Sequence, residues 1–240
     1  MHRSLVEVTS RIGDALPARM GVALRSRFGN SREAEMAMIH LLLPIGGLAV
    51  DVGANKGLWT YQLANRAGQS GGVIAVEPQR HLYQYLGKAF RKHRGVEMYN
   101  CALSEREGER LLQVPQYGGR LVRGRASLED VTSKSISERV QVRSLDGLLS
   151  GRVPDLIKID VEGHHREVLA GASATIHSGS PSLIVELETG QFRQKSAESF
   201  DFLVQACGYR AYWIERGALE RVEAFPPADF EGTANVVFLA

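Results

Sequence analysis

The chain has 240 residues, of which 44% are hydrophobic and 23% are charged. This length suits one domain with a full hydrophobic core, and the composition lacks the bias that is typical of disordered chains. The 29 Lys and Arg residues nearly balance the 27 Asp and Glu residues, which leaves a net charge of +2. Binding to nucleic-acid phosphates usually needs a concentrated basic surface, so we expect no nucleic-acid partner.

The cysteine pattern and the apolar runs bear on the cellular compartment. Cys101 and Cys207 have neither a metal-binding nor a redox spacing. No apolar run reaches the ~20 residues needed to span a bilayer, and the N-terminus lacks the continuous apolar region of a secretory signal. We therefore expect free thiols and a cytoplasmic protein.

Residues 1–44 are predicted to form a helical segment that acts as a lid or cap. Apolar residues recur there at helical spacing, from Leu5 through Ile12 to Leu16, among several arginines. One interpretation is a basic helix that contacts a membrane surface or an anionic, lipid-linked substrate. The simpler one is an amphipathic helix that packs on the core with its basic face in solvent.

Strand and helix patterns alternate over residues 45–240. Apolar strands at 48–52, 73–77 and 96–100 are separated by helical patterns at 58–67 and 81–93, as parallel βαβ units require. Further strand patterns occupy 155–160, 182–188, 209–214 and 235–239, while a polar stretch at about 109–143 indicates a small β insertion. The sequence therefore predicts an α/β fold with a doubly wound, mostly parallel, seven-stranded Rossmann-like sheet.

The first predicted strand ends in Asp51-Val-Gly53-Ala-Asn55-Lys-Gly57. Ligands of such sheets bind beyond the carboxyl ends of the strands. Gly53 and Gly57 permit a tight turn and a close backbone approach, which suits a dinucleotide or S-adenosylmethionine. The alternative is that they are ordinary turn glycines and that Asp51 caps a helix.

Three features bear on the choice of cofactor. The loop does not reproduce the G-x-G-x-x-G spacing that clasps a pyrophosphate. The Asp51 carboxylate would repel a diphosphate but attract the ammonium and sulfonium groups of S-adenosylmethionine. Glu77, followed by Pro78 after the second strand, can accept both ribose hydroxyls, as it could in an NAD site. These features favour S-adenosylmethionine over NAD.

A second polar group, Asp160-Val-Glu162-Gly-His164-His165, follows the fourth predicted parallel strand. Methyl transfer to a hydroxyl needs alignment of oxygen, methyl carbon and sulfur, and removal of one proton. A neutral imidazole suits that proton transfer, so His164 and His165 are candidate bases, although surface histidines at a helix start are common. Asp160 is the best placed for a direct role, and Glu162 completes the catalytic candidates.

Metal binding is a competing use of the same carboxylates. Asp160 and Glu162, with Glu186 or Glu188 from the next strand, could supply oxygen ligands to Mg²⁺, and the spacing leaves this open; we do not favour a metal. Lys158 lies within an apolar strand and needs a partner. We predict an ion pair between Lys158 and Glu186.

Several segments resemble the FkbM family of methyltransferases. They are VDVGANKG (50–57), AVEP (75–78), NCALS (100–104), SLDGLL (144–149) and PDLIKIDVEG (154–163), followed by EVLAGA, LIVELE and NVVF. The resemblance implies a class I methyltransferase fold, S-adenosylmethionine as the donor, and O-methylation of a small molecule, secondary metabolite or glycan hydroxyl. It also places Asn100 to Leu103 at the adenine. His165 stands where the family usually has glutamate.

The expected cofactor-binding residues are Asp51, Gly53, Asn55, Gly57, Trp59, Glu77, Pro78, Asn100, Ala102 and Leu103. An amine acceptor would call for an Asp/Asn-Pro-Pro-aromatic turn after the fourth strand, and Asp160-Val-Glu162-Gly stands there instead, which favours a hydroxyl. Two alternatives remain: a non-catalytic protein that binds S-adenosylmethionine or a substrate, and, more distantly, an NAD(P)-dependent oxidoreductase. The sequence carries no signal for the oligomeric state.

Overall fold

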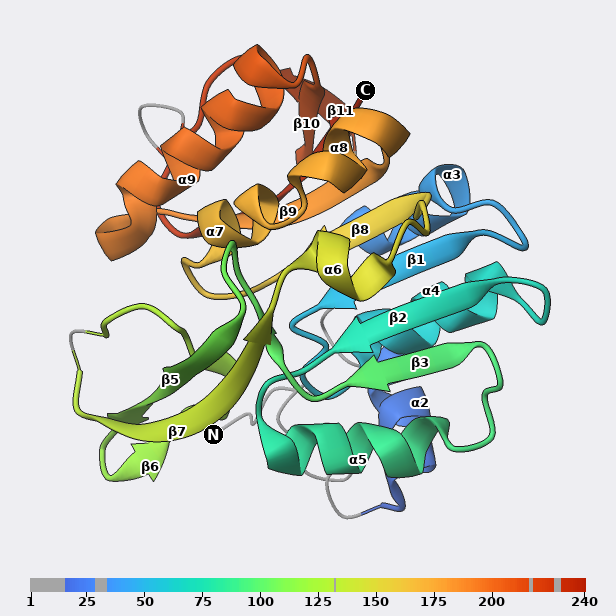
Figure 1. Cartoon of the computed structure of the whole chain (residues 1–240), viewed down its shortest axis with the longest axis vertical. Coiled ribbons are helices and arrows are strands. Elements are labelled where there is room, and N and C mark those ends of the chain that lie inside the picture. Colours follow the sequence, from blue (N-terminus) through green and yellow to red (C-terminus); the bar gives the residue numbers. More distant parts are fainter. Residues whose placement is uncertain (1–15, 29–33, 132, 216–217, 227–229) are drawn as a thin grey trace.

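A sheet of eight strands organises the computed structural model, which describes residues 16–28, 34–131, 133–215, 218–226 and 230–240 (Figure 1). The strand order is β11-β10-β12-β9-β8-β1-β2-β3. Neighbours from β9 to β3 pair in parallel, whereas β12, β10 and β11 pair antiparallel. The bounds are β1 (Leu48–Val52), β2 (Gly72–Val76), β3 (Val96–Tyr99), β8 (Leu156–Ile159), β9 (Ser182–Glu188), β10 (Arg210–Glu215), β11 (Ala218–Val222) and β12 (Thr233–Leu239).

The predicted α/β, mostly parallel sheet is confirmed, but it has eight strands and not seven. The additional strand is β11, which pairs with β10 at the edge of the sheet. Its sequence, ALERV, carries Glu220 and Arg221. An edge strand has one partner and tolerates charge, so the apolar run that marks the central strands is missing there.

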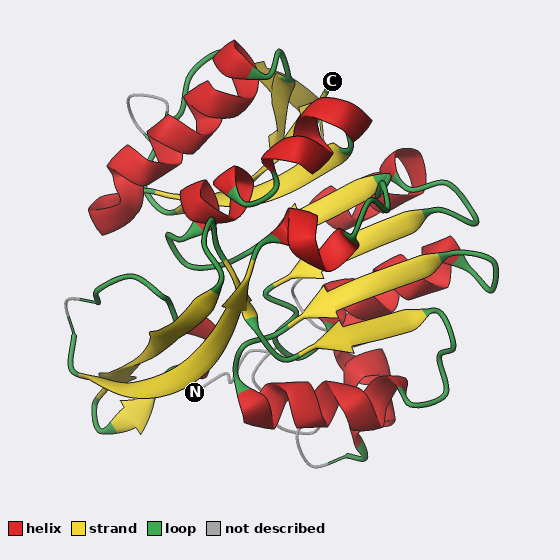
Figure 2. Ribbon diagram, in the orientation of Figure 1, coloured by secondary structure: helices red, strands yellow, loops and turns green. Residues whose placement is uncertain are grey.

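Helices cover both faces of the sheet (Figure 2). On one face, Val50 and Ile157 pack against apolar side chains of the later helices, such as Leu148 and Val168. On the other face, Ala49 packs against α4. Each fully buried Val, Leu or Ile contributes roughly 1.5–3 kcal/mol, so these layers hold the strand ends in place. The bounds are α4 (Leu58–Ala67), α5 (Arg80–Phe90), α6 (Leu145–Leu149), α7 (His165–Ala170), α8 (Ser173–Gly179) and α9 (Arg193–Asp201), with the short turns η2 (Arg123–Arg125), η3 (Gly190–Phe192) and η4 (Phe202–Ala206).

A second sheet, of order β4-β7-β5-β6, stands beside the carboxyl ends of the main strands. In Figure 1 the arrowheads of β2 and β3 point toward it. Its strands are β4 (Ala102–Leu103), β5 (Gly108–Tyr117), β6 (Arg120–Leu121) and β7 (Ser135–Arg143). The long antiparallel pair runs from Gly108 opposite Val142 to Pro115 opposite Ser135. It occupies the region where the sequence predicts a β insertion.

The N-terminal segment is helical where the structure describes it: α2 (Ala18–Phe28), η1 (Ala34–Met38) and α3 (Ile39–Leu42). Helix α2 packs against α4 and α5, with Val22 buried beside Leu86 and Phe90, and the Tyr85 hydroxyl donates a 3.0 Å hydrogen bond to the Ala18 carbonyl. Residues 1–15 and 29–33 lie outside the described residues, so the lid and the membrane contact stay predictions. Among the described helices, none has the length and apolar character needed to cross a membrane.

Candidate active site

The loop between β1 and α4 bends tightly against β2 and β8. The amides of Gly53 and Ala54 both donate 3.0 Å hydrogen bonds to the Val76 carbonyl, and Gly53 and Gly57 have φ values of 84° and 78°. A Cβ at Gly57 would lie 2.7 Å from a methyl carbon of Leu86. Both positions therefore need glycine, for the backbone conformation and for space.

Glu77, immediately after β2, is held rigidly by main-chain donors. The Gln79 amide donates to Oε1 and the Asn55 amide donates to Oε2, each at 2.8 Å. Burial raises the pKa of Glu77 to about 7, although these two hydrogen bonds oppose the shift. The carboxylate keeps free lone pairs, so it can still accept hydrogen bonds from a ligand.

A cleft beyond the ends of β1, β2 and β8 collects most of the predicted cofactor residues. Its walls include Gly53, Asn55, Glu77, Pro78, Ala102 and Leu103. The other four predicted residues are not part of its lining: Asp51, Gly57, Trp59 and Asn100. Asn100 supports the lining, because its amide donates 2.9 Å hydrogen bonds to the carbonyls of Glu77 and Pro78. Trp59 belongs to the core cluster that also contains Ala49.

Asp51 lies under the cleft in a nearly dry environment. Its side chain is 1% exposed, and the Thr60 hydroxyl donates a 2.5 Å hydrogen bond to Oδ2. Burial raises the pKa of Asp51 to about 6, against the Thr60 hydrogen bond and the nearby Lys158 charge. Asp51 thus contributes negative charge beneath the site and has no surface in the cleft.

Lys158 is fully buried within β8, and its predicted ion pair with Glu186 is wrong. The ammonium donates a 2.5 Å hydrogen bond to Asn235 Oδ1 on β12, and its nearest carboxylate is Asp160 Oδ2 at 3.9 Å. It also lies 5.3 Å from the centre of the Trp59 ring. Glu186 and Asn235 are opposite each other on β9 and β12, so the register alone does not choose between them. The ammonium contacts Asn235, and its charge still lowers the pKa of Glu186.

Carboxylates gather where the cleft meets a second pocket. One oxygen each from Asp160, Glu162 and Glu186 lies within 4.8 Å of the other two. Burial, then the Glu188 charge, raises the pKa of Glu162 to about 8, and burial, then the Asp160 charge, raises the pKa of Glu188 to about 7. Burial and the adjacent Asp160 carboxyl raise the pKa of Glu186 well above its ordinary value. Glu162, Glu186 and Glu188 therefore hold protons more tightly than free carboxylates do.

The second pocket opens between the β insertion and the segment that follows β9. It shares Ser127, Glu162 and Glu186 with the cleft. Its other walls include Tyr117, Arg125, Glu188 and Phe192. Phe192 packs so closely on Gly163 that a Cβ there would lie 2.5 Å from the ring. The pocket thus combines aromatic surface with carboxylates beside the cofactor cleft.

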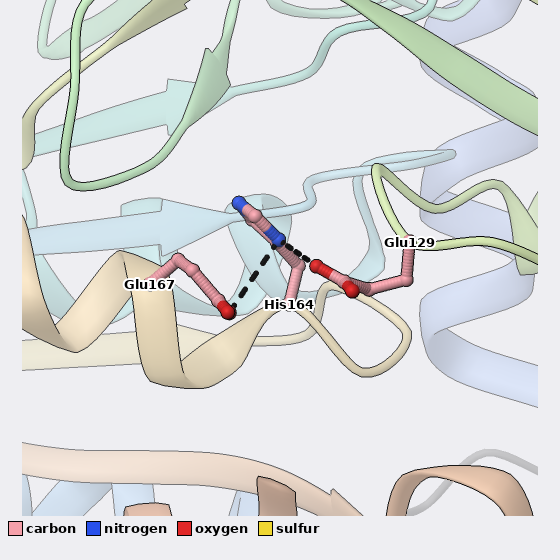
Figure 3. A group of neighbouring side chains, drawn as sticks. All are labelled: Glu129, His164 and Glu167. Carbon is pink, nitrogen blue, oxygen red and sulfur yellow. Dashed lines mark hydrogen bonds and ion pairs between the residues drawn. The ribbon is translucent and has the colours of Figure 1, made fainter.

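His164 lines the cleft but has both ring nitrogens engaged. Nδ1 lies 2.5 Å from Glu129 Oε1 and 3.5 Å from Glu167 Oε2 (Figure 3), and Nε2 lies 3.1 Å from the Ser104 hydroxyl. Lys195 bridges the two carboxylates at 2.6 and 2.9 Å. The hydrogen bond from His164, together with Lys195, lowers the pKa of Glu129 to about 2. His164 therefore ties the insertion to α7.

His165 points away from the cleft into the space beneath α9. It is completely buried, with Nδ1 2.8 Å from the Ser199 hydroxyl and Nε2 3.2 Å from the Ser196 hydroxyl. Burial lowers the pKa of His165 to about 4. His165 therefore lines neither the cleft nor the second pocket, because successive residues at a helix start point in different directions. The structure does not place this predicted catalytic residue at the candidate site.

Residues of the β insertion also line the cleft. We did not predict them from the sequence. The Gln79 amide group donates a 2.9 Å hydrogen bond to the Arg123 carbonyl, and the Ser127 hydroxyl donates a 2.6 Å hydrogen bond to the Glu162 carbonyl. Leu128 adds apolar lining. The sequence shows that this stretch is polar. It does not show these contacts, because they join residues that are 35 or more positions apart.

The cleft fits S-adenosylmethionine by its donor and acceptor chemistry. Glu77 presents a fixed carboxylate for a ribose diol, the Gly53 turn allows close backbone approach, and Asp160 places negative charge at the cleft. The fold is that of class I S-adenosylmethionine-dependent methyltransferases. The model of the methyltransferase FkbM domain matches residues 51–211. The chain therefore belongs to the FkbM methyltransferase family.

Solved structures share this fold at low sequence identity. Methyltransferase FkbM from Methylobacillus flagellatus KT matches with a TM-score of 0.52 and 15% identity, over 97% of this chain and 58% of that one. A "putative rRNA-methylase" from Clostridium thermocellum matches with a TM-score of 0.50 and 10% identity, over 86% of this chain and 94% of that one. This chain thus spans less than two thirds of the FkbM protein's length. No curated protein matches the sequence significantly.

Proposed function

We propose that this protein is an S-adenosylmethionine-dependent O-methyltransferase that acts on a hydroxyl of a small molecule or of a sugar in a glycan or glycolipid. One observation carries the proposal: the carboxylates Glu162 and Glu186 belong to the walls of both the cofactor cleft and the second pocket. An acceptor in the second pocket would meet the donor at these groups.

The cofactor supplies an activated methyl group on a positively charged sulfur. Glu77 would accept hydrogen bonds from the ribose, and the Gly53 turn would approach the amino acid part of the cofactor through its main chain. Ala102 and Leu103 offer apolar surface for the adenine. Asp160 at the cleft and Asp51 beneath it favour the positive charge.

The second pocket suits an acceptor that carries hydroxyl groups. Tyr117 and Phe192 provide apolar faces, and Glu162, Glu186 and Glu188 provide hydrogen-bond acceptors for hydroxyl donors. Holding an acceptor oxygen in line with the methyl carbon and sulfur can lower the barrier by several kcal/mol. The proposed function therefore needs both pockets.

Glu188 is the carboxylate best matched to accept the hydroxyl proton. It lines the second pocket, and burial and the Asp160 charge bring its pKa to about 7, close to the pH at which the enzyme would work. Asp160 faces the cleft and would act on the cofactor's charge. His164, whose ring is engaged on both sides, would hold the insertion over the cleft as a positioning residue.

A labelled-methyl assay against hydroxylated small molecules, sugars and glycolipids tests the proposal. We expect turnover with at least one hydroxylated acceptor, and a fall in kcat of ~10²–10⁴ in Glu188→Gln, the range for loss of a general base. Asp160→Ala should also lower turnover sharply. Glu105→Gln, an exposed change outside both pockets, should leave it unchanged.

Two outcomes would contradict the proposal. Methylation of nitrogen, or of nucleic acid alone, would show that the acceptor is not a hydroxyl of this class. Tight binding of NAD without binding of S-adenosylhomocysteine, measured by calorimetry, would show that the cofactor is wrong. Binding of S-adenosylhomocysteine without turnover on any acceptor would favour a non-catalytic binding protein.

A further inference from the structure

The carboxylates between the two pockets have the geometry of a cation site. Asp160 directly follows β8, Glu162 follows two residues later, and Glu186 projects from β9. One oxygen from each lies within 4.8 Å of the other two. Oxygen ligands of an octahedral Mg²⁺ lie at 2.0–2.1 Å from the ion, so adjacent ligands are ~2.9 Å apart and opposite ligands ~4.2 Å apart. The three side chains would therefore have to rotate toward one another to bind one ion.

Glu188 adds an independent sign that a ligand is missing. It is nine-tenths buried, and its Oε1 is buried without a hydrogen-bond partner, while the carboxylate also accepts a hydrogen bond from the Gly163 amide. It shares the second pocket with Glu162 and Glu186. A buried acceptor without a donor costs about 1–3 kcal/mol, so Glu188 needs a donor, such as a water molecule that arrives with an ion.

The charges of the region are not balanced by the described side chains. Asp160, Glu162, Glu186 and Glu188 carry four negative charges when ionised. Lys158 and Arg125 are the cations that act on them, and Lys158 directs its shortest hydrogen bond to Asn235. Lys158 also acts on Asp51, so two cations face five carboxyls, and a divalent cation would reduce the repulsion among them when they are ionised.

A second group of possible metal ligands in the described residues has similar spacing, but a cation already lies between its carboxylates. Glu129, His164 and Glu167 also place three ligand atoms within 4.8 Å. There, however, the Lys195 ammonium already bridges both carboxylates at 2.6 and 2.9 Å, and the imidazole lies between them (Figure 3). The ammonium already lies between the two carboxylates, although Glu167 Oε2 is also buried without a hydrogen-bond partner. We use this Lys195-bridged group as the comparison for the first.

The sequence left a metal open at these carboxylates without favouring it; from their geometry and from Glu188 we now propose that Asp160, Glu162 and Glu186 bind one divalent cation, Mg²⁺ or Mn²⁺, at the junction of the cofactor cleft and the second pocket. Hard cations of this kind prefer carboxylate oxygens, and an all-oxygen set is unsuited to softer metals. Three protein ligands leave coordination positions for oxygens of a molecule in the second pocket. That the ion orients the acceptor, for example through two neighbouring hydroxyls, rests on the proposed function.

Titration of the full-length protein with Mn²⁺, followed by electron paramagnetic resonance and calorimetry, tests the site. We expect one ion per chain, displaced by Mg²⁺, and at least tenfold weaker binding in Glu186→Gln and in Glu162→Gln. Glu167→Gln, in the Lys195-bridged group, should bind Mn²⁺ like the unmodified protein. Circular dichroism would establish that each variant is folded, and Glu162→Gln, in a loop, serves if Glu186→Gln does not fold.

The proposal is overturned if the protein binds no stoichiometric Mn²⁺, or if only Glu167→Gln weakens binding. Methylation is measured separately in chelator and in added Mg²⁺. Mn²⁺ binding without methylation of any acceptor would support the ion site and contradict the proposed function. Methylation without any bound ion would do the reverse, so the two proposals fail independently.

Discussion

The α-carbon of Gly53 lies directly against the main chain of Asp160. A Cβ at Gly53 would be 1.9 Å from the Asp160 carbonyl oxygen, and the φ of Gly53 is 84°. The contact joins the turn after β1 to the end of β8, and these two segments carry the cofactor loop and the first carboxylate of the proposed cation site. The geometry of the cofactor loop and of the proposed cation site therefore depends on Gly53 having no side chain.

Gly53→Ala should destabilise the protein severely and weaken cofactor binding, because the turn must move away from Asp160. Gly151 is the matched control, since its φ is 87° and a Cβ there would meet open space. Gly151→Ala should cost only the ~1–2 kcal/mol of a left-handed conformation, and Gly53→Ala at least ~2 kcal/mol more. Urea unfolding measures both, and equal losses would contradict the close contact.

The hydrogen bond from Lys158 to Asn235 predicts strong coupling between β8 and β12. Asn235→Leu leaves the buried ammonium without its closest acceptor and should cost about 1–3 kcal/mol. Lys158→Met leaves Asp51 and Asp160 without their neighbouring cation and should cost about 3–5 kcal/mol. A double-mutant cycle by urea unfolding should show that the double variant loses less than the sum of the two. If the two losses of unfolding free energy simply add, the hydrogen bond does not couple the two residues.

Glu77→Gln should weaken the binding of S-adenosylhomocysteine by about 10- to 100-fold, the effect of losing hydrogen bonds to a charged acceptor. The substitution also removes one of the acceptors for the Asn55 and Gln79 amides, which shape the loop. Isothermal titration calorimetry measures the change, with the exposed Glu105→Gln as the control. Unchanged affinity in Glu77→Gln would place the ribose elsewhere.

Because His165 is buried, we expect the protein to lose stability in acid. Burial holds its pKa near 4, whereas the unfolded chain titrates near 6.5. Between these values the unfolded state binds the proton and the folded state does not, so the free energy of unfolding is full above about pH 6.5 and falls by about 3 kcal/mol as the pH approaches 4.

His165→Gln has no titrating group and can still hydrogen-bond to Ser196 or Ser199. The difference in unfolding free energy between the two proteins should therefore shrink as the pH falls from 7 to 4. Urea unfolding at several pH values isolates this difference from the other titrating groups. A difference that is constant across this range would show that His165 is not buried in its neutral form.

Local sequence was enough to predict the sheet and the position of the cofactor loop. Apolar strands such as 48–52 repeat between amphipathic helices, and parallel connections bring the carboxyl ends of those strands to one edge. Gly53 and Glu77 were found in this way, because each follows directly after a strand. The edge strand β11 was missed because a strand with one partner needs no continuous apolar run.

Side-chain partners were decided by the tertiary structure. Lys158 binds Asn235, 77 residues away, and not Glu186, which is opposite Asn235 on the intervening strand. His164 and His165 are adjacent in sequence, yet one lines the cleft and the other is buried between two serines of α9. By itself the sequence determined which residues end the strands, since hydrophobic periodicity is local. Which side chains meet there depends on packing between distant segments, and only the folded chain specifies that packing.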